Sequence, residues 1–191
     1  SRPEQIYLLN RRLMNLNYAD IKYCDVANGE GVRVSLFVSG CTHHCKECFN
    51  KEAWDFHYGN PFTQKEIDRI LEYLKPNYIA GLSLLGGEPM EPVNQEGILP
   101  LLRVVKQTYP EKNIWCYTGY LFDKDVLDKM CKESEVTKEI VSYLDIVVDG
   151  EFMIDRKNLK INFRGSDNQR IIDVKKTLDA GEIVHWEREI Q

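Results

Sequence analysis

The chain has 191 residues, of which 43% are hydrophobic and 29% are charged, a composition typical of one globular domain. Its net charge of −5 argues against a nucleic-acid partner, which needs clustered Lys and Arg to neutralise phosphates. No uncharged apolar stretch is long enough to cross a bilayer, so no membrane role is expected.

In chain order, residues 1–13 are expected to form an N-terminal extension, and residues 14–191 a single domain. The first residues lack the charged, apolar and small-residue zones of a secretory signal. Six cysteines without such a signal favour a reducing compartment, so a cytoplasmic location is expected. The charged C-terminal tail, residues 171–191, is predicted to form a solvated face or a frayed end.

Short apolar runs recur along the chain, and each ends in a loop rich in glycine or polar residues. In order they span residues 34–38, 81–85, 114–117 and 144–148, and the first leads into a cluster of cysteines. Continuous hydrophobicity is typical of buried strands in a parallel sheet. The four loops would then meet at the carboxyl edge of the sheet, where ligands bind in such folds.

Helical patterns separate these runs. Thr63 and Glu66 predict a capping box, and an apolar i, i+3, i+4, i+7 pattern follows from Ile67. Similar spacing recurs in three further segments, 98–105, 126–130 and 140–144. Alternating strands and helices predict an α/β fold, with too few units to close an eight-stranded barrel. We therefore expect an open partial (β/α) barrel, a parallel sheet with flanking helices.

Three cysteines near the end of the first predicted strand point to a metal site. Cys41, Cys45 and Cys48 have the spacing C-x3-C-x2-C. Iron–sulfur clusters usually take four cysteines, so three suit a [4Fe–4S] cluster with one iron open to another ligand. The alternative is a structural zinc ion whose fourth ligand is His43 or His44. The protein would then be a zinc-stabilised interaction module without catalysis. The spacing alone leaves both interpretations open.

The other cysteines and the two histidines are given simpler roles. Cys24, Cys116 and Cys131 lack mutual ligand spacing, and we assign them no metal role. His43 and His44 are expected to be exposed loop residues rather than groups that tune a cluster.

A second motif, Gly86-Gly87-Glu88-Pro89, follows about one βα unit after the cysteines. Together with the cysteine motif and the aromatic Phe49, it resembles the signature of the radical S-adenosylmethionine enzymes. The resemblance implies a partial barrel of that type and a catalytic [4Fe–4S] cluster held by Cys41, Cys45 and Cys48. It also implies an S-adenosylmethionine site. For its contacts we expect residues beside the third cysteine and at two strand ends: Glu47, Cys48, Phe49, Gly86, Gly87, Glu88, Thr118 and Gly119.

Three further segments narrow the resemblance to the activases of glycyl-radical enzymes. Residues 25–33 contain the Asn-Gly-x-Gly turn followed by Arg33, which such activases share broadly. Residues 115–120, Trp-x-Tyr-Thr-Gly-Tyr, and residues 164–169, Arg-Gly-Ser-x-Asn-Gln, resemble the branch that acts on anaerobic ribonucleoside-triphosphate reductases. An activase of a formate-lyase-type enzyme, or another small radical S-adenosylmethionine enzyme, is the nearest alternative.

This resemblance implies a mechanism and two partners. One electron enters the cluster from an external donor such as a flavodoxin and passes to S-adenosylmethionine, whose C5′–S bond breaks. The 5′-deoxyadenosyl radical then takes a hydrogen from a glycine in the large catalytic subunit of the reductase. The cofactor carries the hard chemistry, and the protein must position it and exclude water and oxygen.

Overall fold

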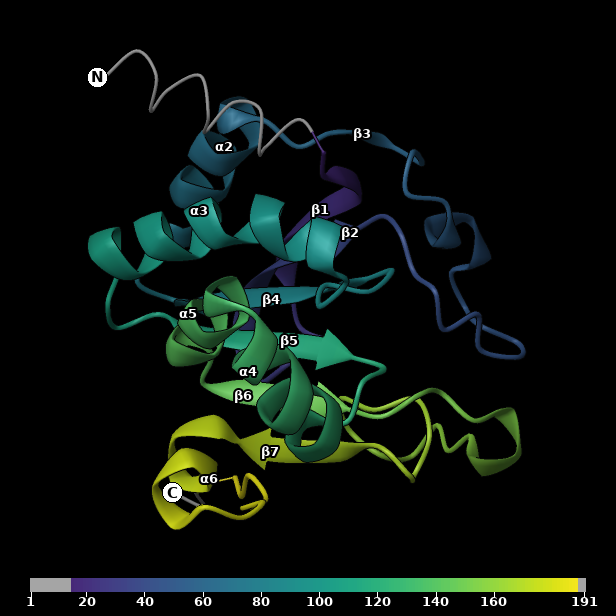
Figure 1. Ribbon diagram of the computed structural model, residues 1–191. Coiled ribbons are helices and arrows are strands. Elements are labelled where there is room, and N and C mark those ends of the chain that lie inside the picture. Colours follow the sequence, from purple (N-terminus) through teal and green to yellow (C-terminus); the bar gives the residue numbers. More distant parts are fainter. Residues whose placement is uncertain (1–14, 189–191) are drawn as a thin grey trace.

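Seven strands form one mixed sheet in the computed structural model, which describes residues 15–188 (Figure 1). In the order β3-β1-β2-β4-β5-β6-β7, neighbours are hydrogen-bonded. The strands are β1 (Asn17–Asp25), β2 (Val32–Val38), β3 (Asn60–Pro61), β4 (Ile79–Gly86), β5 (Asn113–Thr118), β6 (Ile146–Asp149) and β7 (Arg170–Asp173). The helical segments are η1 (Lys51–Trp54), α2 (Gln64–Leu74), α3 (Pro92–Thr108), η2 (Phe122–Met130), α4 (Cys131–Glu133), α5 (Glu135–Tyr143), η3 (Ile154–Arg156) and α6 (Val174–Ala180). The extension expected over residues 1–13 lies outside the described residues.

The centre of the sheet is parallel, and its edges are not. Strands β2, β4, β5 and β6 are the four predicted apolar runs and pair in parallel. The predicted parallel sheet is confirmed for these four strands, but β1 pairs antiparallel with β2 and β3, and β7 pairs antiparallel with β6. Both β1 and β7 mix polar with apolar residues, so they lack the continuous hydrophobicity of strands buried on both faces. The α/β class is confirmed, and the sheet is not closed.

Local sequence explains where the helices begin. At the start of α2, the Thr63 amide donates to Glu66 Oε2 over 2.7 Å, which confirms the capping box. Helix α3 begins earlier than predicted, with Pro92 in the first turn, where its missing N–H costs nothing. Gly97 is buried within α3, where a Cβ atom would lie 2.5 Å from the Cβ of Leu16. No helix within residues 15–188 has the length and apolar character needed to span a membrane.

The two faces of the sheet carry different cores. One face packs on α2, α3, η2 and α5 through residues such as Leu36, Leu84 and Val147, which are at most 1% exposed. The opposite face carries Trp115, Ile146 and Val148, which pack on Phe163 and Trp186 from distant segments. Figure 1 shows the chain between β2 and β3 and the chain between β6 and β7 extending from the same end of the sheet.

Residues 171–188 do not form a frayed end, although most of their charged side chains form the solvated face that was predicted. Ile172 in β7 and Val174 in α6 are fully buried in the main core. After α6, Trp186 packs on Trp115 with ring centroids 5.2 Å apart. Arg188 then forms an ion pair with Glu30 over 2.8 Å. Charged residues are numerous here, but Ile172, Val174 and Trp186 pack in the two cores beside the sheet.

Candidate functional site

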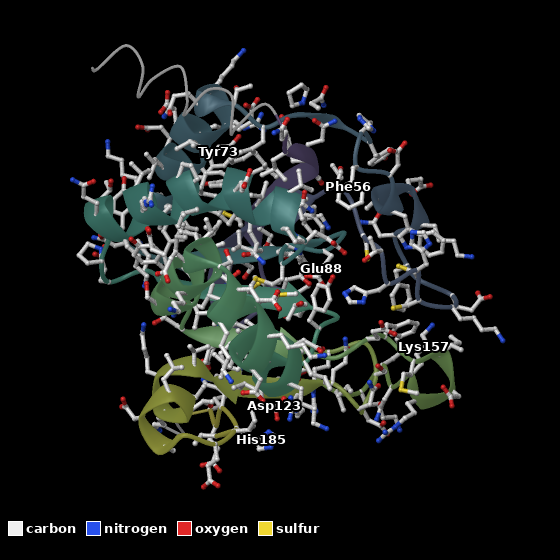
Figure 2. All side chains as sticks on the ribbon, in the orientation of Figure 1. Phe56, Tyr73, Glu88, Asp123, Lys157 and His185 are labelled. Carbon is white, nitrogen blue, oxygen red and sulfur yellow. The ribbon has the colours of Figure 1, made fainter. Side chains whose placement is uncertain are left out.

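A cavity of about 510 Å³ opens at the carboxyl ends of the parallel strands, within the size range of ligand sites. Figure 2 shows Glu88 there, facing the two segments that extend from this end of the sheet. The lining contains nine of the expected site residues: Cys41, Cys45, Cys48, Phe49, Gly86, Gly87, Glu88, Thr118 and Gly119. Glu47, the remaining one, is exposed and is not part of the lining.

Backbone hydrogen bonds tie the start of the cysteine segment to η1, which follows it. The Gly40 amide donates to Ala53 over 2.7 Å, and the Cys41 amide donates to Trp54 over 3.2 Å. Positive φ angles at His44 (+50°) and Glu47 (+57°), a region that few non-glycine residues adopt, curl the chain between the cysteines. The segment therefore forms a compact loop at one end of the cavity rather than a loose connection.

The glycines after β4 are required by close backbone packing. Gly86 has φ = +108°, a conformation that side chains rarely permit. A Cβ atom on Gly87 would lie 2.6 Å from the Gly40 carbonyl oxygen and 2.8 Å from that of Ala53. The Glu88 amide donates to the Gly40 carbonyl over 2.7 Å. The glycine motif and the cysteine motif are therefore packed directly on each other.

The three thiols form a donor set that suits a cluster better than a single ion. Within residues 15–188, no group of three His, Cys, Asp or Glu side chains is placed to hold one metal ion. In an iron–sulfur cubane each cysteine binds a different iron, so three separated thiols on one cavity wall fit that group. Burial raises the pKa of Cys41 to about 11, and burial together with the charge of Glu151 raises the pKa of Cys45. Iron binding must therefore release protons from these thiols.

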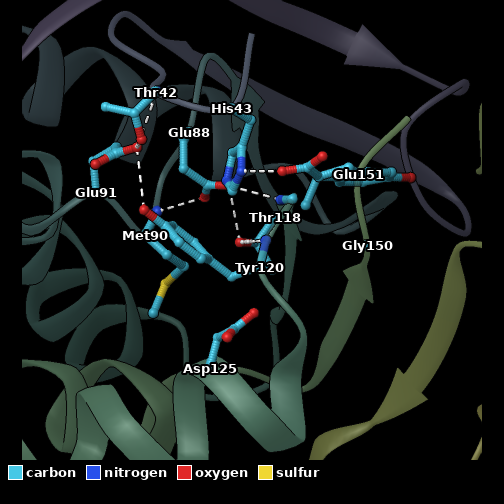
Figure 3. A network of polar contacts seen from close by, with 12 residues as sticks. Thr42, His43, Glu88, Met90, Glu91, Thr118, Tyr120, Asp125, Gly150 and Glu151 are labelled. Carbon is cyan, nitrogen blue, oxygen red and sulfur yellow. Dashed lines mark hydrogen bonds and ion pairs between the residues drawn. The ribbon is translucent and has the colours of Figure 1, made fainter. Parts of the chain in front are cut away.

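The carboxylate of Glu88 connects three parts of the chain (Figure 3). Its Oε1 atom lies 2.8 Å from Nε2 of His43 and accepts hydrogen bonds from the Thr118 hydroxyl over 3.0 Å and the Gly119 amide over 2.6 Å. Its Oε2 atom accepts from the Met90 amide over 2.8 Å. Glu88 is fully buried. Because protein donors occupy both oxygens, this carboxylate ties the cysteine loop to the end of β5.

The prediction that His43 is an exposed loop residue is wrong. Its side chain is only 10% exposed, and its Nδ1 atom lies 2.8 Å from Glu151, opposite the contact with Glu88. Burial alone would lower the pKa of His43, but the two carboxylates outweigh burial and raise it to about 9. At neutral pH the His43 imidazolium therefore donates one hydrogen bond to each of the two carboxylates, Glu88 and Glu151. The prediction is confirmed for His44, which is exposed and stacks on Trp54.

Two charged residues near the cavity have structural partners instead of ligands. Asp149 is fully buried, and both of its oxygens accept hydrogen bonds from Arg170, at 2.9 and 2.5 Å. Arg33 is also fully buried and donates to the Ser83 hydroxyl over 2.7 Å and to the Leu82 carbonyl over 2.9 Å. Sequence reasoning missed the burial of Arg33, because its acceptors lie about fifty residues away along the chain.

Three buried polar atoms of cavity-lining residues have no hydrogen-bond partner among the described residues. They are Nε1 of Trp54, the hydroxyl of Tyr117 and Nε of Arg164. Each atom has almost no accessible surface although other atoms of its residue line the cavity, so these atoms do not mark ligand contacts. The fit to a cluster rests instead on the three thiols and on the glycine turn that packs against their loop.

Comparison with known proteins identifies the class of protein that has this site. Residues 27–172 match a family model described as a 4Fe-4S single cluster domain, so the chain belongs to the proteins that contain such a domain. A relative from Pasteurella multocida (strain Pm70) is 40% identical over 158 residues, which cover 82% of this chain and 96% of the relative. A relative from Enterobacteria phage T4 is 42% identical over 158 residues, 82% of this chain and 93% of the relative. A relative from Escherichia coli (strain K12) is 38% identical over 156 residues, which cover 81% of this chain and 96% of the relative.

All three relatives are named anaerobic ribonucleoside-triphosphate reductase-activating protein. The chain belongs to the family of these activating proteins. This confirms the family predicted from the cysteine and glycine motifs together with residues 25–33, 115–120 and 164–169. The match to a 4Fe-4S domain decides against the zinc-stabilised module, and the names of the relatives favour the reductase branch over a formate-lyase-type activase.

Proposed function

We propose that this chain is a radical S-adenosylmethionine enzyme that activates anaerobic ribonucleoside-triphosphate reductase by forming a glycyl radical on its large catalytic subunit. Cys41, Cys45 and Cys48 would hold a [4Fe–4S] cluster, and the open sheet would be the partial barrel of this enzyme class. One observation carries the proposal. The three cysteines and the Gly86-Gly87 turn line one cavity at the carboxyl ends of the parallel strands.

When bound and reduced, the cluster supplies an electron that cleaves S-adenosylmethionine, and the resulting radical removes hydrogen from a glycine α-carbon. The protein must keep the cysteine loop in place while this occurs. Gly86 and Gly87 allow the loop and the end of β4 to approach closely, and we expect their carbonyls, rather than the Gly87 amide that bonds to Val38, beside the methionine moiety. Glu88 acts by holding His43 and Gly119, since its oxygens are already used within the protein.

The remaining expected contacts to the cosubstrate differ in their support. Thr118 and Gly119 line the cavity directly beside Glu88, where they could contact the nucleoside. Phe49 is 68% exposed at the mouth and packs on Phe152 with ring centroids 5.0 Å apart, a position suited to covering an adenine. The contact with Glu47 stays a prediction, because its side chain lies outside the lining.

The mouth of the cavity must serve both proposed protein partners. Cys45 and Cys48 are half-buried beside it, so a cluster there would lie close enough to the surface for an electron donor such as a flavodoxin. The cavity is open enough at this end to admit a loop of the reductase beside the cosubstrate. Both partners imply a reaction in the cytoplasm.

Anaerobic reconstitution with iron and sulfide tests the proposal. The reduced holoprotein should convert S-adenosylmethionine to 5′-deoxyadenosine and methionine, and should generate a glycyl radical on the cognate reductase, seen by electron paramagnetic resonance. Cys24→Ser is a suitable control, because Cys24 is exposed and outside the cavity. Cleavage without a radical on the reductase would reject the target, and stable zinc binding without cleavage would reject the enzyme.

A further inference from the structure

His43 is the residue at which separate parts of the chain meet the loop that carries the three cysteines (Figure 3). It lies between two proposed ligands, Cys41 and Cys45, yet both of its ring nitrogens contact carboxylates, those of Glu88 and Glu151. In this arrangement neither nitrogen is free to bind a metal. Its partners follow the ends of β4, β5 and β6, so this one side chain connects the loop to three parallel strands.

The end of β5 is built around this histidine. The ring of Tyr120 packs edge-on against His43, with ring centroids 4.4 Å apart. A Cβ atom on Gly119 would lie 2.7 Å from Cδ2 of His43, so a larger residue would displace the histidine. Thr118 and Gly119 also donate hydrogen bonds to the carboxylate oxygen that His43 contacts. These three residues are the second half of residues 115–120, one of the two segments that resemble the reductase branch.

The other such segment, residues 164–169, holds the chain that supplies Glu151. Nδ2 of Asn168 donates to the Glu151 carbonyl over 2.9 Å, and Nε2 of Gln169 donates to the Gly150 carbonyl over 3.0 Å. Two successive carbonyls are thus fixed, and the Glu151 carboxylate lies 2.8 Å from Nδ1 of the histidine. The side chain of Glu151 is 53% exposed, so its position depends on these hydrogen bonds more than on burial.

The residue before His43 is fixed as well. The amide and the hydroxyl of Thr42 donate to Oε1 of Glu91, over 3.1 and 2.5 Å, and the Tyr120 hydroxyl donates to the same oxygen over 3.3 Å. Glu91 is buried. The spacer between the first two cysteines is therefore held by side chains from several parts of the chain. Groups that hold metal ligands in this way commonly contribute about 10–100-fold to metal affinity.

We propose that His43 is a positioning residue through which the two segments that resemble the reductase branch hold Cys41 and Cys45 in place and set the reduction potential of the cluster. This inference rests on the proposed function, because it concerns the proposed cluster. It goes further by giving both segments a role at the cysteine loop. Hydrogen bonds and charges around the sulfurs are the groups by which a protein adjusts such a potential.

Iron release from the reconstituted holoprotein to a chelator measures how firmly the loop is held, without any turnover. Glu151→Ala and Asn168→Ala should each release iron about tenfold faster than the wild type. The melting temperature of both iron-free variants should stay within about 4 °C of the wild type, because a half-exposed ion pair contributes at most about 1 kcal/mol. An unchanged release rate in either variant would overturn the inference, and so would a larger fall in melting temperature, which would attribute the release to unfolding.

A double-variant cycle tests whether Glu151 acts through His43. His43→Gln keeps an N–H donor for Glu88 and removes the donor to Glu151. In this background Glu151→Ala should change the release rate by less than about twofold, because its partner is already gone. Additive effects would show that the two residues act independently and would overturn the inference.

Matched controls come from neighbouring residues of the same types. His44 is exposed and has φ = +50°, a conformation that asparagine tolerates, so His44→Asn is the control for His43→Gln. Asn162 is exposed in the chain between β6 and β7, so Asn162→Ala is the control for Asn168→Ala. Both controls should release iron at the rate of the wild type. Release from a control as fast as from its matched variant would overturn the inference.

The reduction potential is a readout that a merely structural contact would not change. In a redox titration followed by electron paramagnetic resonance, His43→Gln removes a positive charge and should lower the equilibrium constant for cluster reduction about tenfold, or about 59 mV. Glu151→Gln removes a negative charge and should raise this constant, by a smaller factor because Glu151 is half exposed. Shifts of both variants in the same direction would indicate general damage and would overturn the inference.

The outcomes for His43 and for the proposed function are distinct. If the wild type takes up no [4Fe–4S] cluster, or forms no radical on the reductase, the proposed function fails. If the wild type does both, and the His43, Glu151 and Asn168 variants match its iron release and reduction potential, only the role of His43 is rejected.

Discussion

Replacing Glu88 by glutamine should destabilise the protein strongly, because the carboxylate is buried and used at both oxygens. In Glu88→Gln the amide oxygen can keep the three contacts of Oε1, with His43, Thr118 and Gly119. The amide nitrogen then faces the Met90 amide, which loses its acceptor. An unsatisfied buried donor costs about 1–3 kcal/mol. The buried imidazolium of His43 also loses one of its two carboxylates. The total loss should approach about 3–5 kcal/mol.

Urea unfolding of the iron-free protein at pH 7 measures this loss. With a slope of about 2 kcal/mol per M, the midpoint should fall by roughly 2 M at unchanged slope. Glu96→Gln is the matched control, because Glu96 is exposed on α3 and should change stability by less than about 0.5 kcal/mol. A loss below about 1 kcal/mol for Glu88→Gln would refute the reasoning, since the network would then contribute little.

Three further changes follow from the same contacts. Gly87→Ala should lower the free energy of unfolding by about 1–3 kcal/mol and reduce iron loading, because its Cβ would meet the Gly40 carbonyl; unchanged iron content would count against this packing. Trp186→Ala should cost about 2–3 kcal/mol through its lost contact with Trp115, whereas a frayed tail would show no change in thermal melting. Burial alone would raise the pKa of Asp25, but its hydrogen bonds outweigh burial and lower the pKa. The ionised carboxylate therefore stabilises the fold above about pH 4, and this stabilisation is lost as the pH falls below that value. The stability gap between the wild type and Asp25→Asn should therefore narrow from pH 7 to pH 3, and a constant gap would contradict it.

Local signals in the sequence predicted the centre of the fold well. The four apolar runs are the four parallel strands, because burial on both faces leaves a continuous pattern that needs no partner to be recognised. The capping box at Thr63 is likewise a local interaction. Strands β1 and β7 and the packing of Trp186 depend on contacts with other strands of the sheet. Their mixed composition gave no comparable signal.

In the candidate site, too, local motifs could be predicted from the sequence and long-range contacts could not. The cysteines and Gly86-Gly87 could be located from motif and strand-end position, and the structure places them on one cavity wall. The burial of His43 depends on Glu151, which lies 108 residues further along the chain. Arg33 likewise depends on acceptors contributed by β4. Such long-range partners have no spacing rule, so the sequence could not distinguish these side chains from exposed ones.

The glycyl-radical signal of the cognate reductase tests the central claim most directly. Reductase incubated anaerobically with the reconstituted protein, a reductant and S-adenosylmethionine should show the radical by electron paramagnetic resonance, as it should with Cys24→Ser. The Ala variants of Cys41, Cys45 and Cys48 should each give no signal, because each removes one ligand of the cluster. A full signal from any one of these three variants, or none from the wild type, would contradict the account.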